Sequence, residues 1–145
     1  MKRWLEEIGR PEMVTRLLWI IGAAGLAVRL VLVLMTQNIG GVASLDSSTY
    51  HSIATNLLAG RGFSQDGINP TLFVAPLYPF FLAAVYRVAG VHPLLVELLQ
   101  VLFGVASAFL AWLITRARFG RMPGLIAFVL VLFLPELMVS NTYLY

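Results

Sequence analysis

The sequence predicts an all-α integral membrane protein, and three observations support that fold class. Of its 145 residues, 59% are hydrophobic and only 12% are charged, whereas soluble domains are about a quarter charged. Three apolar runs, at residues 17–36, 93–115 and 122–141, approach or reach the ~20 residues that a helix needs to cross a bilayer. The basic residues cluster beside these runs, as topology signals do, and not as a nucleic-acid-binding surface does.

The first apolar run, residues 17–36, is predicted to be an uncleaved membrane anchor. A polar stretch with three glutamates precedes the run, which is longer than the core of a signal peptide and lacks a small-x-small cleavage site. Its single charge is Arg29, about two-thirds of the way along. A buried arginine within a span is costly, so we treat Arg29 as a candidate functional residue.

The polar segment that follows the first run is the most organised part of the sequence. Apolar residues recur at helical spacing over residues 47–59, which predicts an amphipathic helix. Asp46 is a favourable N-cap for this helix, and Gly60 is a favourable residue just beyond its end. The dipeptide Asp66-Gly67 predicts a turn in the loop that follows.

The apolar stretch at residues 77–89 permits two membrane topologies. Pro76 and Pro79 break its first turn, and as a helix the stretch reaches only about 20 Å, which is shorter than the ~30 Å hydrocarbon core. Runs of this length are more often interfacial than spanning. We therefore expect three transmembrane helices and a surface helix here, with four transmembrane helices as the alternative.

The distribution of basic residues favours three spans. The groups that flank the spans are Lys2, Arg3, Arg10 and Arg16 before the first, and Arg116, Arg118 and Arg121 between the second and third. The positive-inside rule places both groups in the cytoplasm, which requires that residues 77–89 do not cross. We expect residues 1–16 and 116–121 to be cytoplasmic and residues 37–92 to form one large external loop with two amphipathic juxtamembrane helices. The protein is then a multi-pass protein of the plasma membrane (the inner membrane in a bacterium).

An ordered series of residues resembles the first external loop of polyprenyl-phosphate-sugar-dependent membrane glycosyltransferases. The series is Asp46-x-x-x-Tyr50-x-x-x-Ala54-x-Asn56-Leu57-Leu58-x-Gly60-x-Gly62-Phe63, then Ala75-Pro76-Leu77-Tyr78-Pro79 and a short apolar helix that ends at Gly90. Arg29-Leu30 in the first span and the Arg/Gly-rich turn at residues 116–121 extend it. In these features the chain is similar to relatives of protein O-mannosyltransferases and lipid A aminoarabinose transferases, which have the C-type membrane fold.

The resemblance implies transfer of a sugar from a polyprenyl-phosphate donor to a protein, lipid or glycan acceptor on the external face, with inversion at the anomeric carbon. It implies that Asp46 is the catalytic residue, either as general base or as a charged organiser of the site. Arg29, Arg61 and Arg87 are candidate ligands of the lipid phosphate, because guanidinium groups suit phosphate. Tyr50, one helical turn beyond Asp46, is a candidate to orient the carboxylate.

No cofactor is predicted for this transfer. His51 does not share a helix face with Asp46, and no other His or acid has ligand spacing, so no metal site is predicted, although a divalent metal is left open. The expected partners are the polyprenyl-phosphate sugar, membrane lipids and the remainder of a longer polypeptide, with no nucleic acid. The resemblance implies that the chain is the N-terminal part of a glycosyltransferase module and is inactive alone.

Two alternatives stay open beside the enzyme. A small membrane subunit or lipid-binding scaffold would use the loop helices only to shape an interface. A transporter or flippase for the same lipid would need a path across the bilayer, which three spans with one interior charge do not supply. The candidate residues also have ordinary roles: Asp46 as a helix cap worth ~1 kcal/mol, Arg29 as a partner of an acid or a side chain that reaches the surface, and Arg61 and Arg87 as contacts to lipid headgroups.

Overall fold

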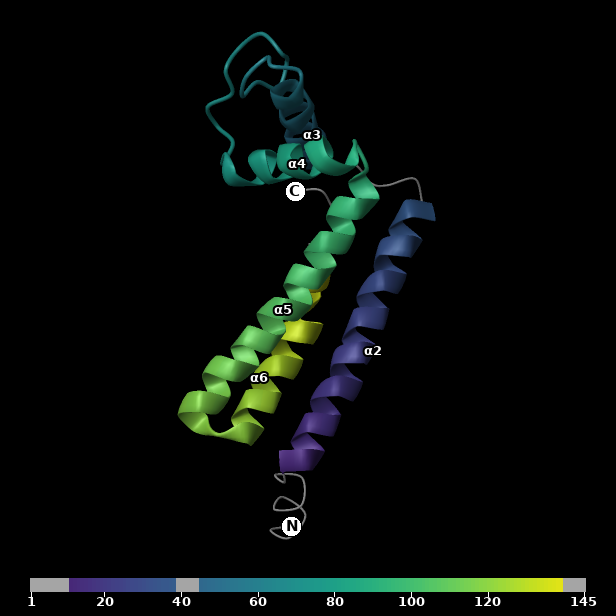
Figure 1. Cartoon of the computed structure of the whole chain (residues 1–145), viewed down its shortest axis with the longest axis vertical. Coiled ribbons are helices and arrows are strands. Elements are labelled where there is room, and N and C mark those ends of the chain that lie inside the picture. Colours follow the sequence, from purple (N-terminus) through teal and green to yellow (C-terminus); the bar gives the residue numbers. More distant parts are fainter. Residues whose placement is uncertain (1–10, 39–44, 140–145) are drawn as a thin grey trace. The chain divides into compact units, whose positions relative to one another are not determined.

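A computed structural model describes residues 11–38 and 45–139, and helices dominate this part of the chain (Figure 1). The chain divides into two compact units. Of the described residues, unit 1 contains 11–32 and 100–139, and unit 2 contains 33–38 and 45–99. Helices α2 (Pro11–Asn38) and α5 (Pro93–Phe119) contribute to both units.

Unit 1 consists of the larger parts of α2 and α5 together with α6 (Arg121–Phe133) and α7 (Pro135–Val139). Helices α5 and α6 form a hairpin, and the end of α5 lies at the same end of the unit as the start of α2 (Figure 1). By length and composition, Pro11–Met35 and Pro93–Phe119 can each cross a membrane. Helix α6 is apolar but shorter.

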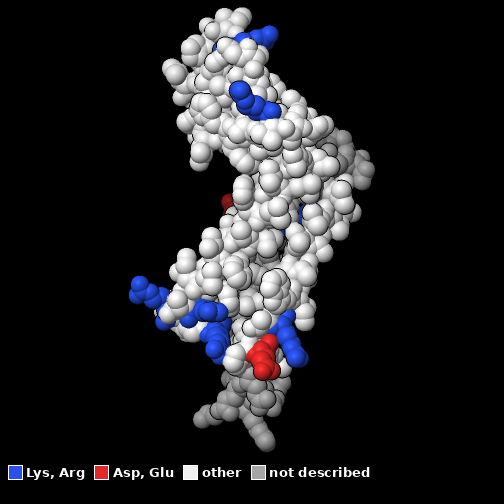
Figure 2. All heavy atoms as spheres, in the orientation of Figure 1, with Lys and Arg blue, Asp and Glu red and all other residues white. Residues whose placement is uncertain are grey.

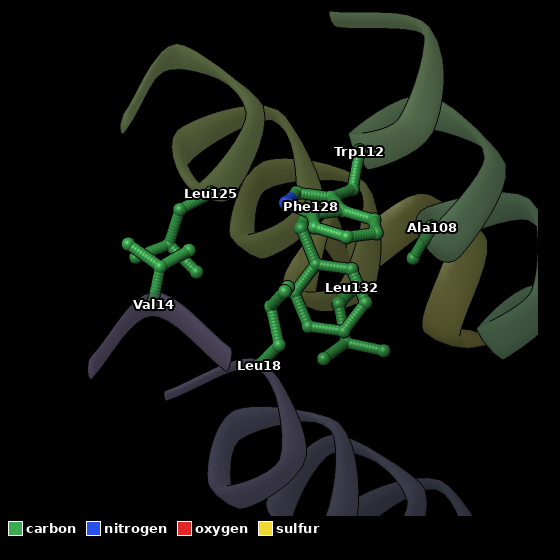
Figure 3. Packing of buried hydrophobic residues seen from close by; sticks show 7 residues of the cluster. All are labelled: Val14, Leu18, Ala108, Trp112, Leu125, Phe128 and Leu132. Atoms are coloured by element: carbon green, nitrogen blue, oxygen red, sulfur yellow. The ribbon is translucent and has the colours of Figure 1, made fainter. Parts of the chain in front are cut away.

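Three helices contribute side chains to the core of unit 1, and these side chains point toward one another (Figure 3). The buried residues are Val14 and Leu18 from α2, Ala108 and Trp112 from α5, and Leu125, Phe128 and Leu132 from α6. Their spacing of three, four and seven residues within each helix is the spacing of one helix face. The core therefore follows directly from the helical periodicity of the apolar residues.

The predicted third span, residues 122–141, is interrupted in the structure. Helix α6 ends at Phe133, Leu134 has an extended backbone, and α7 begins at Pro135. Proline has no N–H to donate, its ring clashes with the preceding turn, and it disfavours helical conformation in the residue before it. The apolar composition of the run predicts a continuous membrane span and does not indicate this break in the backbone.

The boundaries of the other helices differ modestly from the predicted ones. Helix α4 (Leu77–Ala89) has the predicted bounds, whereas α3 (Leu45–Leu58) begins two residues before the predicted position. Gly60 has a φ of 72°, which confirms its place just beyond the end of α3. Helix α5 continues to Phe119, so most of the predicted linker at residues 116–121 is helical.

Unit 2 is built on the packing of α3 against α4 and the first turns of α5. Its buried residues are Ala54 from α3, Leu82, Ala83 and Tyr86 from α4, and Val96 from α5. On α4 the buried positions are Pro79, Leu82, Ala83 and Tyr86, a single helix face. This shared core fixes α3 relative to the beginning of a helix that can cross the membrane.

Basic side chains gather at one end of unit 1. Arg16 lies near the start of α2, while Arg116 and Arg118 lie in the last turn of α5 and Arg121 begins α6. Figure 2 shows blue side chains concentrated at this end of the molecule. The predicted three-span topology requires the start of α2 and the end of α5 to lie on the same side of the membrane. Lys2, Arg3 and Arg10, the other basic residues of the predicted cytoplasmic group, lie outside the described residues.

Helices α2 and α6 approach each other closely at Gly25. A Cβ atom at Gly25 would lie 2.5 Å from Leu132 Cδ2 and 2.6 Å from its Cγ, whereas one at Gly22 would lie 3.5 Å from Phe128 Cζ. Leu132 is fully buried and has no room to move away. Glycine at position 25 is therefore required for the contact.

We expect Gly25→Ala to destabilise the chain and Gly22→Ala to leave it unchanged or slightly more stable. Alanine gains up to ~1 kcal/mol of helix propensity at both positions, but overpacking against Leu132 costs about 1–3 kcal/mol at position 25 only. Thermal or denaturant unfolding in detergent micelles measures the difference. Equal stability of the two variants would contradict the close approach.

Candidate functional site

The predicted catalytic residue, Asp46, lies in the first turn of α3. The sequence predicted Asp46 as the N-cap of this helix. In the structure the helix begins at Leu45, so Asp46 lies inside the first turn. The structure describes the backbone of Asp46 but not its side chain. A carboxylate in the first turn of a helix is stabilised by the positive end of the helix dipole.

Two aromatic contacts dock α3 onto α4 just beyond Asp46. The ring of Tyr50 meets the ring of Tyr78 edge-on, with centroids 5.2 Å apart. The ring of His51 meets that of Tyr86 in the same manner at 5.6 Å, and His51 Nδ1 lies 3.1 Å from Tyr86 Oη. Tyr50 therefore packs against α4 and in this way supports the helix that carries Asp46.

The Tyr86 hydroxyl lies in the interior of unit 2, with 2% of the residue exposed. Burial and the negative charge of Glu97 raise the pKa of Tyr86, because both disfavour the phenolate. The phenol therefore keeps its proton at neutral pH, and it forms a hydrogen bond with His51 whose direction depends on the tautomer of the imidazole. No local pattern predicts this pair, since the partners are 35 positions apart in the sequence.

Asn56 organises the start of the loop between α3 and α4. Its Nδ2 donates to the carbonyl oxygens of Ser64 at 2.9 Å and Gln65 at 3.2 Å, and Arg61 Nη1 lies 3.5 Å from its Oδ1. The side chain is buried, and these hydrogen bonds satisfy its amide group. Asn56 thus holds the loop that carries Arg61 against the helix.

Asp66 closes the predicted turn by accepting hydrogen bonds from four groups. The N–H groups of Asn69 and Ile68 donate to Oδ1 at 2.7 and 2.8 Å, and the side chains of Asn69 and Ser64 donate at 2.8 and 2.9 Å. These hydrogen bonds hold the pKa of Asp66 well below its usual range, with the Asn69 N–H as the largest cause. The adjacent Gly67 has a φ of 76°, which confirms the Asp-Gly turn.

Arg61 and Arg87 are exposed on unit 2. Arg61 follows Gly60 at the start of the loop, and Arg87 lies in the last turn of α4. Unit 2 thus holds Tyr50, Arg61, Arg87 and the backbone of Asp46, whereas Arg29 belongs to unit 1. Among the described residues, no three His, Asp or Glu side chains gather in a way that could hold a metal ion.

Arg29 binds the break between α6 and α7. Only 1% of the residue is exposed, and its Nη2 donates to the carbonyl of Leu132 at 2.9 Å while Nη1 donates to that of Leu137 at 3.0 Å. The last four carbonyls of a helix have no partner within it, and Leu132 is one of these in α6. Arg29 therefore joins both sides of the interruption with hydrogen bonds that span more than 100 positions of sequence.

We expect Arg29→Met to destabilise unit 1 strongly, because it leaves the carbonyls of Leu132 and Leu137 without these donors. An unsatisfied buried polar group costs about 1–3 kcal/mol. Arg29→Lys, which retains one charged donor group, should be intermediate. Unfolding in micelles together with hydrogen exchange of α7 measures the effect, and a methionine variant as stable as the parent would refute the role.

One comparison with known proteins gives a match. The family model described as dolichyl-phosphate-mannose-protein mannosyltransferase matches residues 73–144. No curated protein and no solved structure matches the chain. The matched segment includes α4, α5, α6 and α7 but neither α3 nor Asp46. The match covers just under half of the 145-residue chain and supports the superfamily that the loop residues resemble.

Proposed function

We propose that the chain forms part of a membrane glycosyltransferase that moves a sugar from a polyprenyl-phosphate donor to a hydroxyl group of a protein, lipid or glycan. The observation that carries the proposal is the family match over α4 to α7, in a chain with two helices able to cross a membrane. The transfer takes place on the external face, beside the surface that α3 and α4 form.

The proposed reaction needs a base and a site for a phosphate. The acceptor oxygen forms a bond to the anomeric carbon while the bond from that carbon to the phosphate oxygen breaks, so the configuration inverts. The acceptor proton passes to Asp46, and the electron pair of the broken bond leaves with the lipid phosphate. Because the leaving group is already a phosphate, no nucleotide is required.

The packing of unit 2 supports the choice of Asp46. Tyr50 and His51, four and five positions further along α3, both contact α4. Since α4 shares a core with Val96 of α5, the first turn of α3 has a fixed place relative to the start of a membrane helix. A base must be held within reach of its acceptor, and this packing provides a rigid support for one.

Arg61 and Arg87 are the better candidates for contact with the lipid phosphate. Both are exposed on the unit that carries Asp46. Arg29 donates through both of its Nη atoms to carbonyl groups in unit 1, and these contacts support a structural role for it. We propose that Arg61 or Arg87 neutralises the charge that develops on the leaving phosphate.

The proposed topology places the basic end of unit 1 in the cytoplasm and residues 37–92 outside. Support comes from the common end shared by Arg16 and the Arg116–Arg121 turn, since both groups satisfy the positive-inside rule together. A helix α4 that crossed the bilayer would separate the two groups. The N-terminus is then cytoplasmic.

We expect Asp46→Asn to lower sugar transfer by roughly 10²- to 10⁴-fold, the usual contribution of a general base. Asparagine has nearly the same size and is tolerated as well at a helix start, so expression should not change. The assay follows a labelled sugar from a polyprenyl-phosphate donor in membranes that contain the intact gene product. Glu12→Gln, which removes an exposed acid from the first turn of α2, is the matched control and should retain transfer.

The same pair of variants separates the enzyme from the alternative scaffold. Full transfer by Asp46→Asn would remove Asp46 from the mechanism. Absence of transfer by the parent protein with every polyprenyl-phosphate sugar tested, together with an unchanged phenotype of Asp46→Asn, would favour a non-enzymatic membrane subunit.

A further inference from the structure

The basic end of unit 1 brings arginines from three helices to one surface. These are Arg16 of α2, Arg116 and Arg118 of α5, and Arg121 of α6, all of them exposed. The acid described near this end is Glu12, so positive charge dominates it (Figure 2). The proposed sugar transfer makes no use of this surface.

A tight turn fixes the position of two of these arginines. Gly120 N–H donates to the carbonyl of Arg116 at 3.1 Å, and Gly124 N–H donates to that of Gly120 at 3.2 Å. A Cβ atom at Gly124 would lie 2.8 Å from Arg116 Cβ, so only glycine lets α6 approach α5 this closely. Arg116 in turn lies over the ring of buried Trp112 at 4.5 Å. Arg116 and Arg121 are therefore held on one compact turn.

Helix electrostatics account for only part of this charge. Arg116 and Arg118 lie at the C-terminal end of α5, where the helix dipole favours cations. Arg121 instead begins α6, where the dipole disfavours positive charge. Gly120 supplies no side-chain cap to α6. An anion outside the protein would compensate the unfavourable position of Arg121.

Exposed aromatic side chains beside the arginines indicate where that anion comes from. Phe119, in the turn itself, is 74% exposed, and Trp19, one helical turn beyond Arg16, is 76% exposed. Tryptophan and phenylalanine side chains at a membrane surface insert at the boundary between the lipid headgroups and the acyl chains. Clustered basic residues next to a spanning helix attract anionic lipids at this level.

We infer that Arg16, Arg116, Arg118 and Arg121 form a binding surface for the phosphate group of an anionic phospholipid, with Phe119 and Trp19 against its acyl chains. The surface is independent of the proposed sugar transfer and belongs wholly to unit 1. It selects anionic over zwitterionic lipids because the arginines attract a headgroup with a net negative charge, which zwitterionic headgroups lack. A free phosphate ion shares the same chemistry but lacks the acyl contact.

The test measures lipid binding to the purified full chain in detergent, by native mass spectrometry with phosphatidylglycerol and phosphatidylcholine. Arg116→Gln with Arg121→Gln should weaken phosphatidylglycerol binding about 30-fold, since each arginine near an anionic surface contributes about fivefold. The charge-matched control is Leu72→Glu with Phe73→Glu, which lowers the net charge by the same two units at exposed positions of unit 2 and should change this binding little. Phosphatidylcholine binding should be weak in all three proteins.

Three outcomes would overturn the inference. Equal weakening by the two double variants would show that binding follows net charge instead of this surface. Equal retention of the two lipids by the parent would show no anionic selectivity. Complete displacement of phosphatidylglycerol by inorganic phosphate at matched concentration would assign the surface to a free anion. Circular dichroism verifies that the variants keep their helices, and Arg118→Gln, outside the tight turn, serves as a milder variant if the double variant does not fold.

Discussion

A protein chain within a bilayer must satisfy its backbone hydrogen bonds with its own groups. This constraint accounts for the position of Arg29 beside the helix break at Pro135. Pro135 stops α6 and leaves carbonyl groups without helical partners. Arg29 supplies donors to Leu132 and Leu137 on the two sides of that break. The buried guanidinium of Arg29 thereby supplies donors that the interrupted helix lacks, and the carbonyls in turn satisfy the arginine.

The same constraint bears on α4. Pro76 and Gly90 cap the two ends of the helix Leu77–Ala89, which is too short to cross a bilayer without leaving backbone groups exposed to lipid. Its buried face packs against α3 and Val96, so it forms part of the support for Asp46. In the proposed enzyme, α4 does not span the membrane and holds the catalytic surface at the membrane boundary.

Local signals in the sequence were sufficient for the short helices of the loop. Pro76 and Gly90 bracket α4, Gly60 ends α3, and Asp66-Gly67 makes its turn, because each of these effects acts within a few residues. The contacts of Arg29, and that of His51 with Tyr86, join residues far apart in sequence, so they could not be predicted from periodicity or spacing. The burial of Asn56 was missed for the same reason, since its partners belong to a loop that folds back.

The candidate site was predicted less directly than the fold. The roles of Asp46, Arg61 and Arg87 came from an ordered resemblance, and the family match supports the superfamily through a segment that excludes Asp46. Composition identified a membrane chain but carried no information about chemistry. The packing of α3 on α4 adds physical support for the proposed role of Asp46, because it gives the first turn of α3 a defined place.

The most direct test of this account is whether the basic end of α5 lies on the opposite side of the membrane from the loop between α3 and α4. Because the chain has no cysteine, Leu72→Cys in the exposed loop and Arg118→Cys at the basic end can each be labelled alone with an impermeant maleimide. In intact cells the account predicts labelling of the cysteine at position 72, and labelling of that at position 118 only after the membrane is opened. Labelling of both in intact cells would mean that α4 crosses the bilayer, and would contradict the three-span arrangement on which the proposed site depends.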